Sequence, residues 1–163
     1  MKIGIMSDSH DRIDNVAKAM KVFDKEGVGA IIHCGDLCAP FMIDELAEFK
    51  EEIYVIAGNI CDEKRTCEIC SEKGVNFYGE VAELDIDDRK IGVVHVPELA
   101  ESMALSQKYD VVFFGHTHSP SVKRAGKTLL ANPGELMGRN GIVSVGIYNT
   151  EDNSIKHMEL RWK

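Results

Sequence analysis

Metal-binding side chains follow five short apolar segments of this 163-residue chain. Each segment is long enough for a buried strand and too short for a helix, and each runs into Asp, Asn or His. The candidate ligands are Asp8, His10, Asp36, Asn59, His95, His116 and His118. Residues two apart in an extended chain point the same way, so each Asp-x-His or His-x-His pair can converge on one ion.

The donor set indicates a pair of transition-metal ions. Two carboxylates, one amide oxygen and four imidazoles exceed what a single catalytic ion with an open coordination position needs. Two ions that share a bridging carboxylate would use the whole set. A mixture of nitrogen and oxygen donors without thiolate suits Mn, Ni, Co, Fe or Zn better than Mg or Ca, which prefer oxygen ligands.

Strands and helices alternate in the first half of the chain. Apolar runs predict buried strands at residues 3–6, 30–34 and 53–57. Helical spacing of apolar residues predicts helices at residues 13–24, 41–49 and 63–73. Gly27 and Gly74 are placed to end the first and last of these helices. The alternation predicts an α/β fold with a parallel sheet, and ligands bind such sheets at the carboxyl ends of the strands.

The second half of the chain is richer in strands. A hairpin is predicted at residues 81–86 and 90–94, followed by a helix at residues 98–108. Further strands are predicted at residues 111–114, 122–124, 129–130, 142–148 and 155–160. Because no linker or repeat divides the chain, we expect one domain over residues 1–163.

The ordered motifs resemble those of the calcineurin-like metallophosphoesterase superfamily, in particular its small single-domain archaeal and bacterial phosphodiesterases. The resemblance covers nearly the whole chain and is carried by Asp8-x-His10, Gly35-Asp36, Gly58-Asn59, His95, Gly115-His116-x-His118 and Asn132-Pro133-Gly134-Glu135. Each motif alone is weak, but five metal-ligand motifs in the family's order are specific. The resemblance implies a two-sheet β-sandwich flanked by helices, in a four-layer αββα arrangement.

The resemblance also implies how the ligands divide between two metal ions. The ligands of the first ion would be Asp8, His10 and His118. The ligands of the second ion would be Asn59, His95 and His116. Asp36 would bridge the two ions, and a hydroxide held between them would attack phosphorus.

Two positions depart from the family's pattern. The family usually has a His after its motif Asn, or in small members another polar residue followed by an acid, but this chain has Ile60-Cys61-Asp62. Asp62 is therefore the candidate proton donor to the leaving group, with Cys61 a weaker candidate. The Gly and second polar residue that follow the family's third-motif His are replaced by Val96-Pro97, which predicts a different loop shape beside the substrate.

These observations predict a metal-dependent phosphodiesterase that hydrolyses small or exposed phosphodiesters. A chain of this length leaves no room for a capping domain, so we expect an open site. The preference for a diester rests on the family resemblance. Two other functions stay open: a phosphomonoesterase, and a non-catalytic interaction scaffold, since a retromer subunit of eukaryotes resembles this family. The presence of all seven ligands favours an enzyme.

The composition narrows the partners and the location. Lys and Arg number 19 against 27 Asp and Glu, which gives a net charge of −8, and such a surface disfavours duplex nucleic acid and anionic membranes. No apolar stretch reaches about 18 residues, and five cysteines are an odd number for a disulfide framework. We therefore expect a cytoplasmic protein with a small phosphoester substrate; whether it forms a homo-oligomer stays open.

Two histidines and one cysteine pair fall outside the motifs. His33 lies in a buried apolar run and is expected to pack or to orient a ligand. His157 lies on an alternating strand and is expected to face solvent. Cys67 and Cys70 lack a second pair with metal-site spacing, so they are expected to pack on one helix face.

Overall fold

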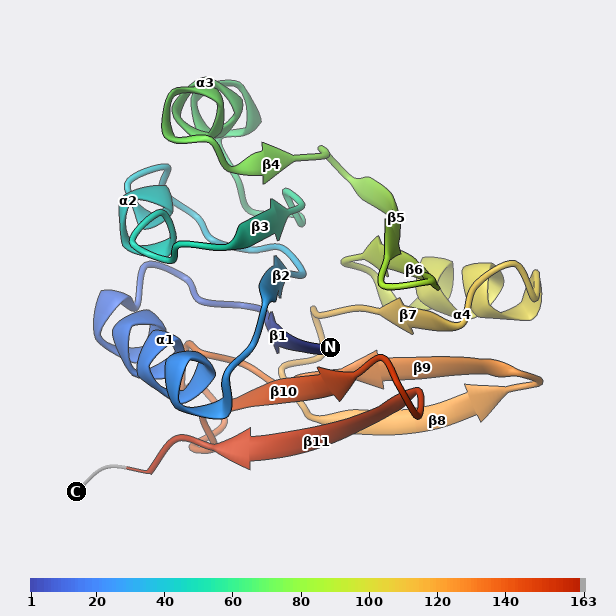
Figure 1. Cartoon of the computed structure of the whole chain (residues 1–163). Helices are drawn as coiled ribbons and strands as arrows, with labels where there is room; N and C mark the ends of the chain where they lie inside the picture. Colours follow the sequence, from blue (N-terminus) through green and yellow to red (C-terminus); the bar gives the residue numbers. More distant parts are fainter. Residues whose placement is uncertain (162–163) are drawn as a thin grey trace.

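The computed structural model describes residues 1–161 and contains two β-sheets packed face to face, with helices on both outer faces (Figure 1). The predicted α/β class and the two-sheet sandwich flanked by helices are confirmed. The strand order of the first sheet is β11-β10-β1-β2-β3-β4, and that of the second is β5-β6-β7-β9-β8.

The first sheet joins a parallel half to an antiparallel half. Its parallel strands are β1 (Lys2–Met6), β2 (Ala30–His33), β3 (Glu52–Val55) and β4 (Asn76–Phe77). Its antiparallel strands, on the other side of β1, are β10 (Ser144–Asn149) and β11 (Ser154–Glu159). The parallel half carries the helical crossovers that the alternating sequence pattern predicts.

The second sheet has a parallel centre and antiparallel edges. The central strands are β6 (Arg89–Val94), β7 (Val111–Phe113) and β9 (Thr128–Asn132). The edge strands are β5 (Val81–Ile86) and β8 (Ser121–Ala125). As predicted, β5 and β6 form a hairpin.

Helices cover the outer face of each sheet. The helices that cover the first sheet are α1 (Ile13–Glu26), α2 (Met42–Leu46) and α3 (Glu63–Lys73), and they lie on the left in Figure 1. The second sheet is covered by α4 (Pro97–Leu105), on the right in Figure 1. Separate apolar clusters therefore fill the layer between the sheets and the layers beneath the helices.

The packing of β1 shows why its whole apolar run is buried. Ile3 and Ile5 join the cluster between the two sheets, whereas Met6 joins the cluster beneath the helices. Gly4 faces the same way as Met6, and a Cβ built on it would lie 2.8 Å from the ring of Phe23 in α1. Successive side chains of a strand point to opposite faces, so a strand covered on both faces has no polar side.

Several element boundaries differ from the sequence prediction. The predicted helix at residues 41–49 is only the five residues of α2, because the chain turns at Ala47 towards β3 and Phe49 packs on the core from outside a helix. The helix predicted at residues 98–108 ends at Leu105. Gln107 follows with a left-handed φ of 58° and donates side-chain hydrogen bonds to the carbonyls of Ala104 and Ala125. The two-residue strand β4 was missing from the prediction.

No helix within residues 1–161 is long and apolar enough to cross a membrane.

Candidate metal centre

The predicted ligands meet at one edge of the sandwich. Asp8, Asp36 and Asn59 follow the parallel strands β1, β2 and β3 of the first sheet. His95 and the His116-x-His118 pair follow the parallel strands β6 and β7 of the second sheet. Since parallel strands end at a common edge, both sheets deliver their polar residues to the same place.

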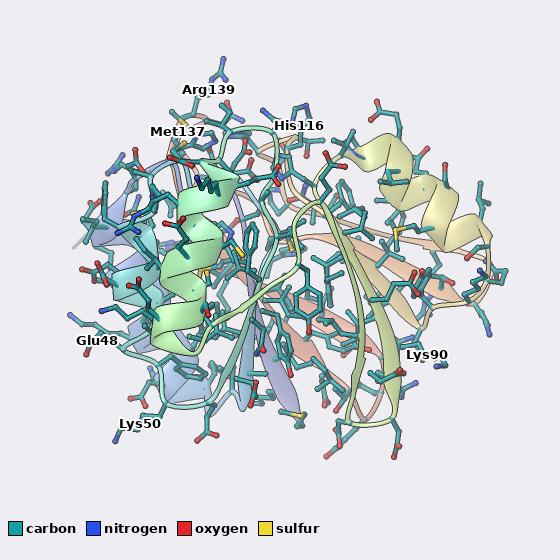
Figure 2. The ribbon with its side chains drawn as sticks, turned by 90° about the horizontal axis from the view of Figure 1, so that it is seen from above. Glu48, Lys50, Lys90, His116, Met137 and Arg139 are labelled. Carbon is teal, nitrogen blue, oxygen red and sulfur yellow. The ribbon has the colours of Figure 1, made fainter. Side chains whose placement is uncertain are left out.

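Figure 2 shows the two edges of the sandwich well separated. Lys50 and Lys90, near the starts of β3 and β6, lie at one end of the view. His116 lies at the other end, together with Met137 and Arg139. The site is therefore at the carboxyl edge of the strands, with residues of the β9–β10 connection beside it.

Two overlapping groups of ligand atoms converge at this edge. Within each group the ligand atoms lie within 4.8 Å of one another, and the groups are Asp8, His10 and His118, and Asp8, Asp36 and His95. Nε2 of His95 is 3.2 Å from Oδ2 of Asp36, and Nε2 of His118 is 3.3 Å from Oδ1 of Asp8. Nε2 of His10 is 3.6 Å from Oδ2 of Asp36 and 3.9 Å from Oδ1 of Asp8. Both carboxylates therefore lie between His10 and His95.

Asn59 and His116 form the exposed side of the site. Oδ1 of Asn59 is 2.8 Å from Nδ1 of His116, and the His116 ring packs edge-on against His95 with the ring centroids 5.2 Å apart. Both side chains are exposed, in contrast to the buried carboxylates. The structure thus brings all seven predicted residues together and leaves the approach over these two open.

Backbone N–H groups orient the two carboxylates. Oδ1 of Asp36 accepts hydrogen bonds from the N–H groups of Asn59 and Ile60, both at 2.8 Å. Oδ2 of Asp8 accepts one from the N–H of His116 at 3.1 Å. The same N–H also lies 3.3 Å from Oδ1 of Asp8. Oδ2 of Asp36 and Oδ1 of Asp8 face the histidines, and the backbone contacts fix the orientation of both carboxylates.

The buried acids and His95 have shifted pKa values. Burial raises the pKa of Asp8, and the neighbouring Ser7 hydroxyl and His95 offset this only in part. Burial acts in the same direction on Asp36, but the contact with His95 and the hydrogen bond from the N–H of Ile60 bring its pKa below the ordinary value. Burial alone would lower the pKa of His95, whereas its contact with Asp36 raises it overall. Protons and metal ions therefore compete for these atoms.

Cys34 and Cys38 contact the Nδ1 atoms of two predicted ligand histidines. Nδ1 of His95 is 2.8 Å from the carbonyl oxygen of Cys34, and Nδ1 of His10 is 3.1 Å from Sγ of Cys38. With Nδ1 engaged in this way, Nε2 is the nitrogen that each ring turns towards the carboxylates.

Glu135 holds the third ligand histidine. Its carboxylate is fully buried, with Oε2 at 2.5 Å from Nδ1 of His118. The other oxygen, Oε1, accepts a hydrogen bond from the N–H of Asn140 at 2.6 Å. The sequence placed Glu135 in a turn motif and gave it no role at the site.

Unpaired buried nitrogens support a metal site. Nε2 of His10 and Nε2 of His95 are buried, and neither has a hydrogen-bond partner within residues 1–161. A buried polar atom without a partner costs about 1–3 kcal/mol, yet both atoms face carboxylates. These residues therefore fit divalent ions bound between the histidine nitrogens and the carboxylates.

The ligands sit on unusual backbone. Left-handed φ angles between 40° and 67° occur at Asp8, His10, Asp36, His116 and His118. Such conformations cost about 1–3 kcal/mol each in a non-glycine residue and cluster at functional sites. The turns after β1, β2 and β7 therefore store strain at the residues that carry the predicted ligand atoms.

Gly58 allows the loop after β3 to approach Asp36. Its φ is 79°, and a Cβ on it would lie 2.4 Å from both the backbone nitrogen and Oδ1 of Asp36. The absence of a side chain at this position is what lets the next two N–H groups reach the carboxylate.

Asp62, the candidate proton donor, caps a helix. Its exposed carboxylate accepts a hydrogen bond from the N–H of Arg65 at 3.2 Å, at the start of α3. It belongs to neither group of converging ligands. Its role as an acid stays a prediction.

The two histidines outside the motifs are both held by protein atoms. His33 is fully buried, with Nε2 3.1 Å from the hydroxyl of Ser9 and Nδ1 accepting from the N–H of Gly35. This agrees with a packing role. His157 was expected to face solvent, which is wrong: it is half-buried, with Nε2 2.7 Å from the carbonyl oxygen of Asn132 across the two sheets.

Cys67 and Cys70 lie on α3, but the expectation that both pack is wrong for Cys67. Cys67 is exposed, and Cys70 is buried, which raises the pKa of its thiol to about 12. In the part of the chain that the structure describes, neither group of converging metal ligands contains a cysteine.

Known proteins resemble the chain over its whole length. Phosphodiesterase MJ0936 of Methanocaldococcus jannaschii is 35% identical over 167 residues, which cover 98% of this chain and 99% of that protein. A solved structure of an archaeal phosphodiesterase matches with a TM-score of 0.90 and 34% identity, covering 98% of this chain and all of that one. The phosphoesterase Yfce from E. coli matches with a TM-score of 0.72 over 99% of this chain and all of its own, but at 17% identity this likeness shows the fold alone.

A family model agrees with these matches. The model of the calcineurin-like phosphoesterase superfamily domain matches residues 1–153. Together with the archaeal relative and the convergence of the ligand motifs at one sheet edge, this match shows that the chain belongs to the calcineurin-like phosphoesterase superfamily.

Proposed function

We propose that the chain is a phosphodiesterase that hydrolyses small or exposed phosphodiesters with two divalent metal ions, in a single domain spanning residues 1–163. The observation that carries this proposal is the placement of two carboxylates between histidines that come from opposite sheets. The choice of a diester draws on the archaeal phosphodiesterase with 35% identity.

The proposed ligands divide into two sets. One ion is held by Asp8, His10 and His118, which the first compact group of ligand atoms supports. The other ion is held by Asn59, His95 and His116. Asp36 bridges the ions, and its position between His10 and His95 supports this role.

The chain's own residues prepare the site for these ions. His95 and His118 have Nδ1 atoms engaged by a carbonyl and a carboxylate, so each ring presents Nε2 to the metal. When bound there, divalent ions such as Mn, Ni, Co, Fe or Zn would supply an activated water and would offset charge on the phosphoryl group. Asn59 and His116 lie on the exposed side, where an anionic substrate can approach.

The test compares a diester with a monoester under defined metal conditions. Hydrolysis of bis-p-nitrophenyl phosphate and of p-nitrophenyl phosphate is measured with Mn, Ni, Co, Zn or Mg and in EDTA. We expect faster, metal-dependent release from the diester and no release in EDTA. A faster reaction with the monoester would reassign the protein as a phosphomonoesterase.

Asp36→Asn tests the bridging role. Replacing the carboxylate by an amide weakens both metal positions, so we expect turnover to fall by more than about 100-fold while the circular dichroism spectrum stays unchanged. The matched control is Asp85→Asn, which changes an exposed carboxylate on β5. Normal turnover by a folded Asp36→Asn protein would refute the two-metal site. No turnover by metal-loaded wild-type protein would favour an interaction scaffold.

A further inference from the structure

A cavity opens beside the metal centre on the Asn59 side. Its volume is about 200 Å³, and it is lined by Gly58, Asn59, Glu80, His95, Val96 and Leu99. Two of these residues are proposed metal ligands, so a group held in the cavity would be adjacent to the reacting phosphorus. The remaining side chains are those of Glu80, Val96 and Leu99, and none of these belongs to the ligand motifs.

The apolar side of the cavity comes from the start of α4. Val96 and Leu99 are 40% and 44% exposed, and both line this cavity. Ligand pockets are lined mainly by hydrophobic side chains with a few polar groups among them, and these two side chains form the apolar part of this lining. The replacement of the family's small and polar residues by Val96-Pro97 thus creates an apolar wall.

The polar side of the cavity is a carboxylate. Glu80 lies in the connection between β4 and β5, is exposed, and has no hydrogen-bond or ion-pair partner within residues 1–161. A free carboxylate at the mouth of an apolar cavity accepts hydrogen bonds from donor groups. It also repels anions at close range.

We propose that this cavity receives one ester substituent of the substrate and selects an apolar, preferably aromatic, group that is neutral or cationic over an anionic one. The inference rests on the proposed phosphodiesterase function and names its substrate class. Diesters whose substituents carry further negative charge, such as neighbouring phosphates, are then poor substrates. The specificity comes from Val96, Leu99 and Glu80, while the metal ligands handle the phosphoryl group.

Symmetrical diesters test the apolar wall, because either substituent can then fill the cavity. Leu99→Ala should raise the KM for bis-p-nitrophenyl phosphate about five- to tenfold, with kcat within about twofold, because it removes apolar contact with the ring. Leu105→Ala is the matched control, since Leu105 lies on the same helix, is 70% exposed and does not line the cavity. Equal KM values for the two variants would overturn the proposed contact between the apolar wall and the substrate.

A charged diester tests Glu80. For bis(4-carboxyphenyl) phosphate, Glu80→Gln should lower the KM about three- to tenfold, because a repulsion at close range is removed. For bis-p-nitrophenyl phosphate the KM should stay within about twofold. Glu151→Gln makes the same charge change at an exposed position away from the cavity and should leave the KM values for both diesters unchanged. An equal effect of Glu80→Gln on both diesters would overturn the charge selection.

A binding measurement separates this inference from the proposed activity. Benzylamine or benzoate is titrated into metal-free, ¹⁵N-labelled protein, and backbone amide shifts are followed. Benzylamine should move the amides of Asn59, His95, Val96, Glu98 and Leu99, and benzoate should not. Leu99→Ala should weaken the binding of benzylamine about five- to tenfold, while Leu105→Ala leaves it unchanged. If benzylamine moves these amides but the protein hydrolyses no diester, only the proposed activity is refuted. Absence of these shifts in an active enzyme would refute the cavity assignment.

Discussion

The ligand histidines differ most in what holds their second nitrogen. His95 is held by a carbonyl and His10 by a thiol, whereas His118 is held by the fully buried carboxylate of Glu135. A carboxylate partner fixes the ring and also increases the basicity of the coordinating nitrogen. We therefore expect Glu135 to influence the proposed metal site through His118.

Removing the charge of Glu135 should weaken metal binding. Glu135→Gln keeps the size of the side chain and a hydrogen-bonding oxygen, so the fold should persist, but metal affinity should fall about 10- to 100-fold. Calorimetric titration of Mn²⁺ into EDTA-stripped, dialysed protein measures this affinity. Glu151→Gln provides the control with the same loss of charge. An affinity equal to wild type would show that Glu135 serves packing alone.

Asp62 is both a helix cap and the candidate acid, and its substitution by Asn separates these two roles. Asn caps helices as well as Asp does, so Asp62→Asn should keep the stability of α3 while removing the proton. Diesters with poor alkyl leaving groups should then slow more than those with p-nitrophenyl groups. Asp62→Ala should slow the same diesters and also lose about 1 kcal/mol of stability. Equal slowing of both kinds of diester by Asp62→Asn would remove Asp62 as the acid.

At the scale of elements, the sequence predicts the ends of a helix correctly where a capping residue or a glycine marks them. The predicted bounds of α3 match the structure because Asp62 caps its start and Gly74, at a φ of 73°, ends it. Gly27 ends α1 in the same way. Helix α2 carries no such stop, and its early end depends on where β3 must begin, which is tertiary information.

The same distinction applies to the site. The seven predicted ligands follow strands, so period and position within each segment were sufficient to predict that they meet at one sheet edge. The partners of His10 and His118 lie 28 and 17 residues away along the chain, and only the packing of loops from different strands brings them together. Sequence spacing carries no signal for such contacts, which is why Cys38 and Glu135 were not assigned.

The contact between β1 and α1 sets how closely the first sheet and its helices pack. Gly4→Ala places a Cβ 2.8 Å from the ring of Phe23 and should cost about 1–3 kcal/mol in the free energy of unfolding. Urea denaturation of metal-free protein measures the cost. Phe23→Leu makes room for the new methyl group, so the double variant should lose less than the sum of the single losses. Strict additivity would show that the two residues do not limit the packing.

At the scale of the whole molecule, the site joins the two halves of the sandwich. Three strands of the first sheet and two of the second lead into predicted ligands, so these residues cannot gather unless the sheets have packed. Metal binding is then linked to global folding rather than to one loop. The free energy of unfolding of the metal-free protein must therefore be measured in EDTA.

The global stability in EDTA should depend on pH through His33. This imidazole is fully buried on β2, and burial lowers its pKa to about 3. The N–H of Gly35 donates to Nδ1, so the ring is neutral and Nε2 donates to Ser9. In the unfolded chain the pKa is about 6.5. Between these values only the unfolded chain binds a proton, so His33 destabilises the fold as the pH falls below 6.5.

The slope is about 1.4 kcal/mol per pH unit, which amounts to about 2 kcal/mol at pH 5. Urea unfolding of wild type, His33→Asn and His157→Asn at pH 7 and pH 5 isolates this contribution, because Asn can keep the acceptor for Gly35 and does not titrate. We expect the loss between the two pH values to be about 2 kcal/mol smaller in His33→Asn than in the other two proteins. If all three lose the same amount, His33 takes up its proton within the folded state, and the burial of its ring is relieved by local opening of the loop at Ser9.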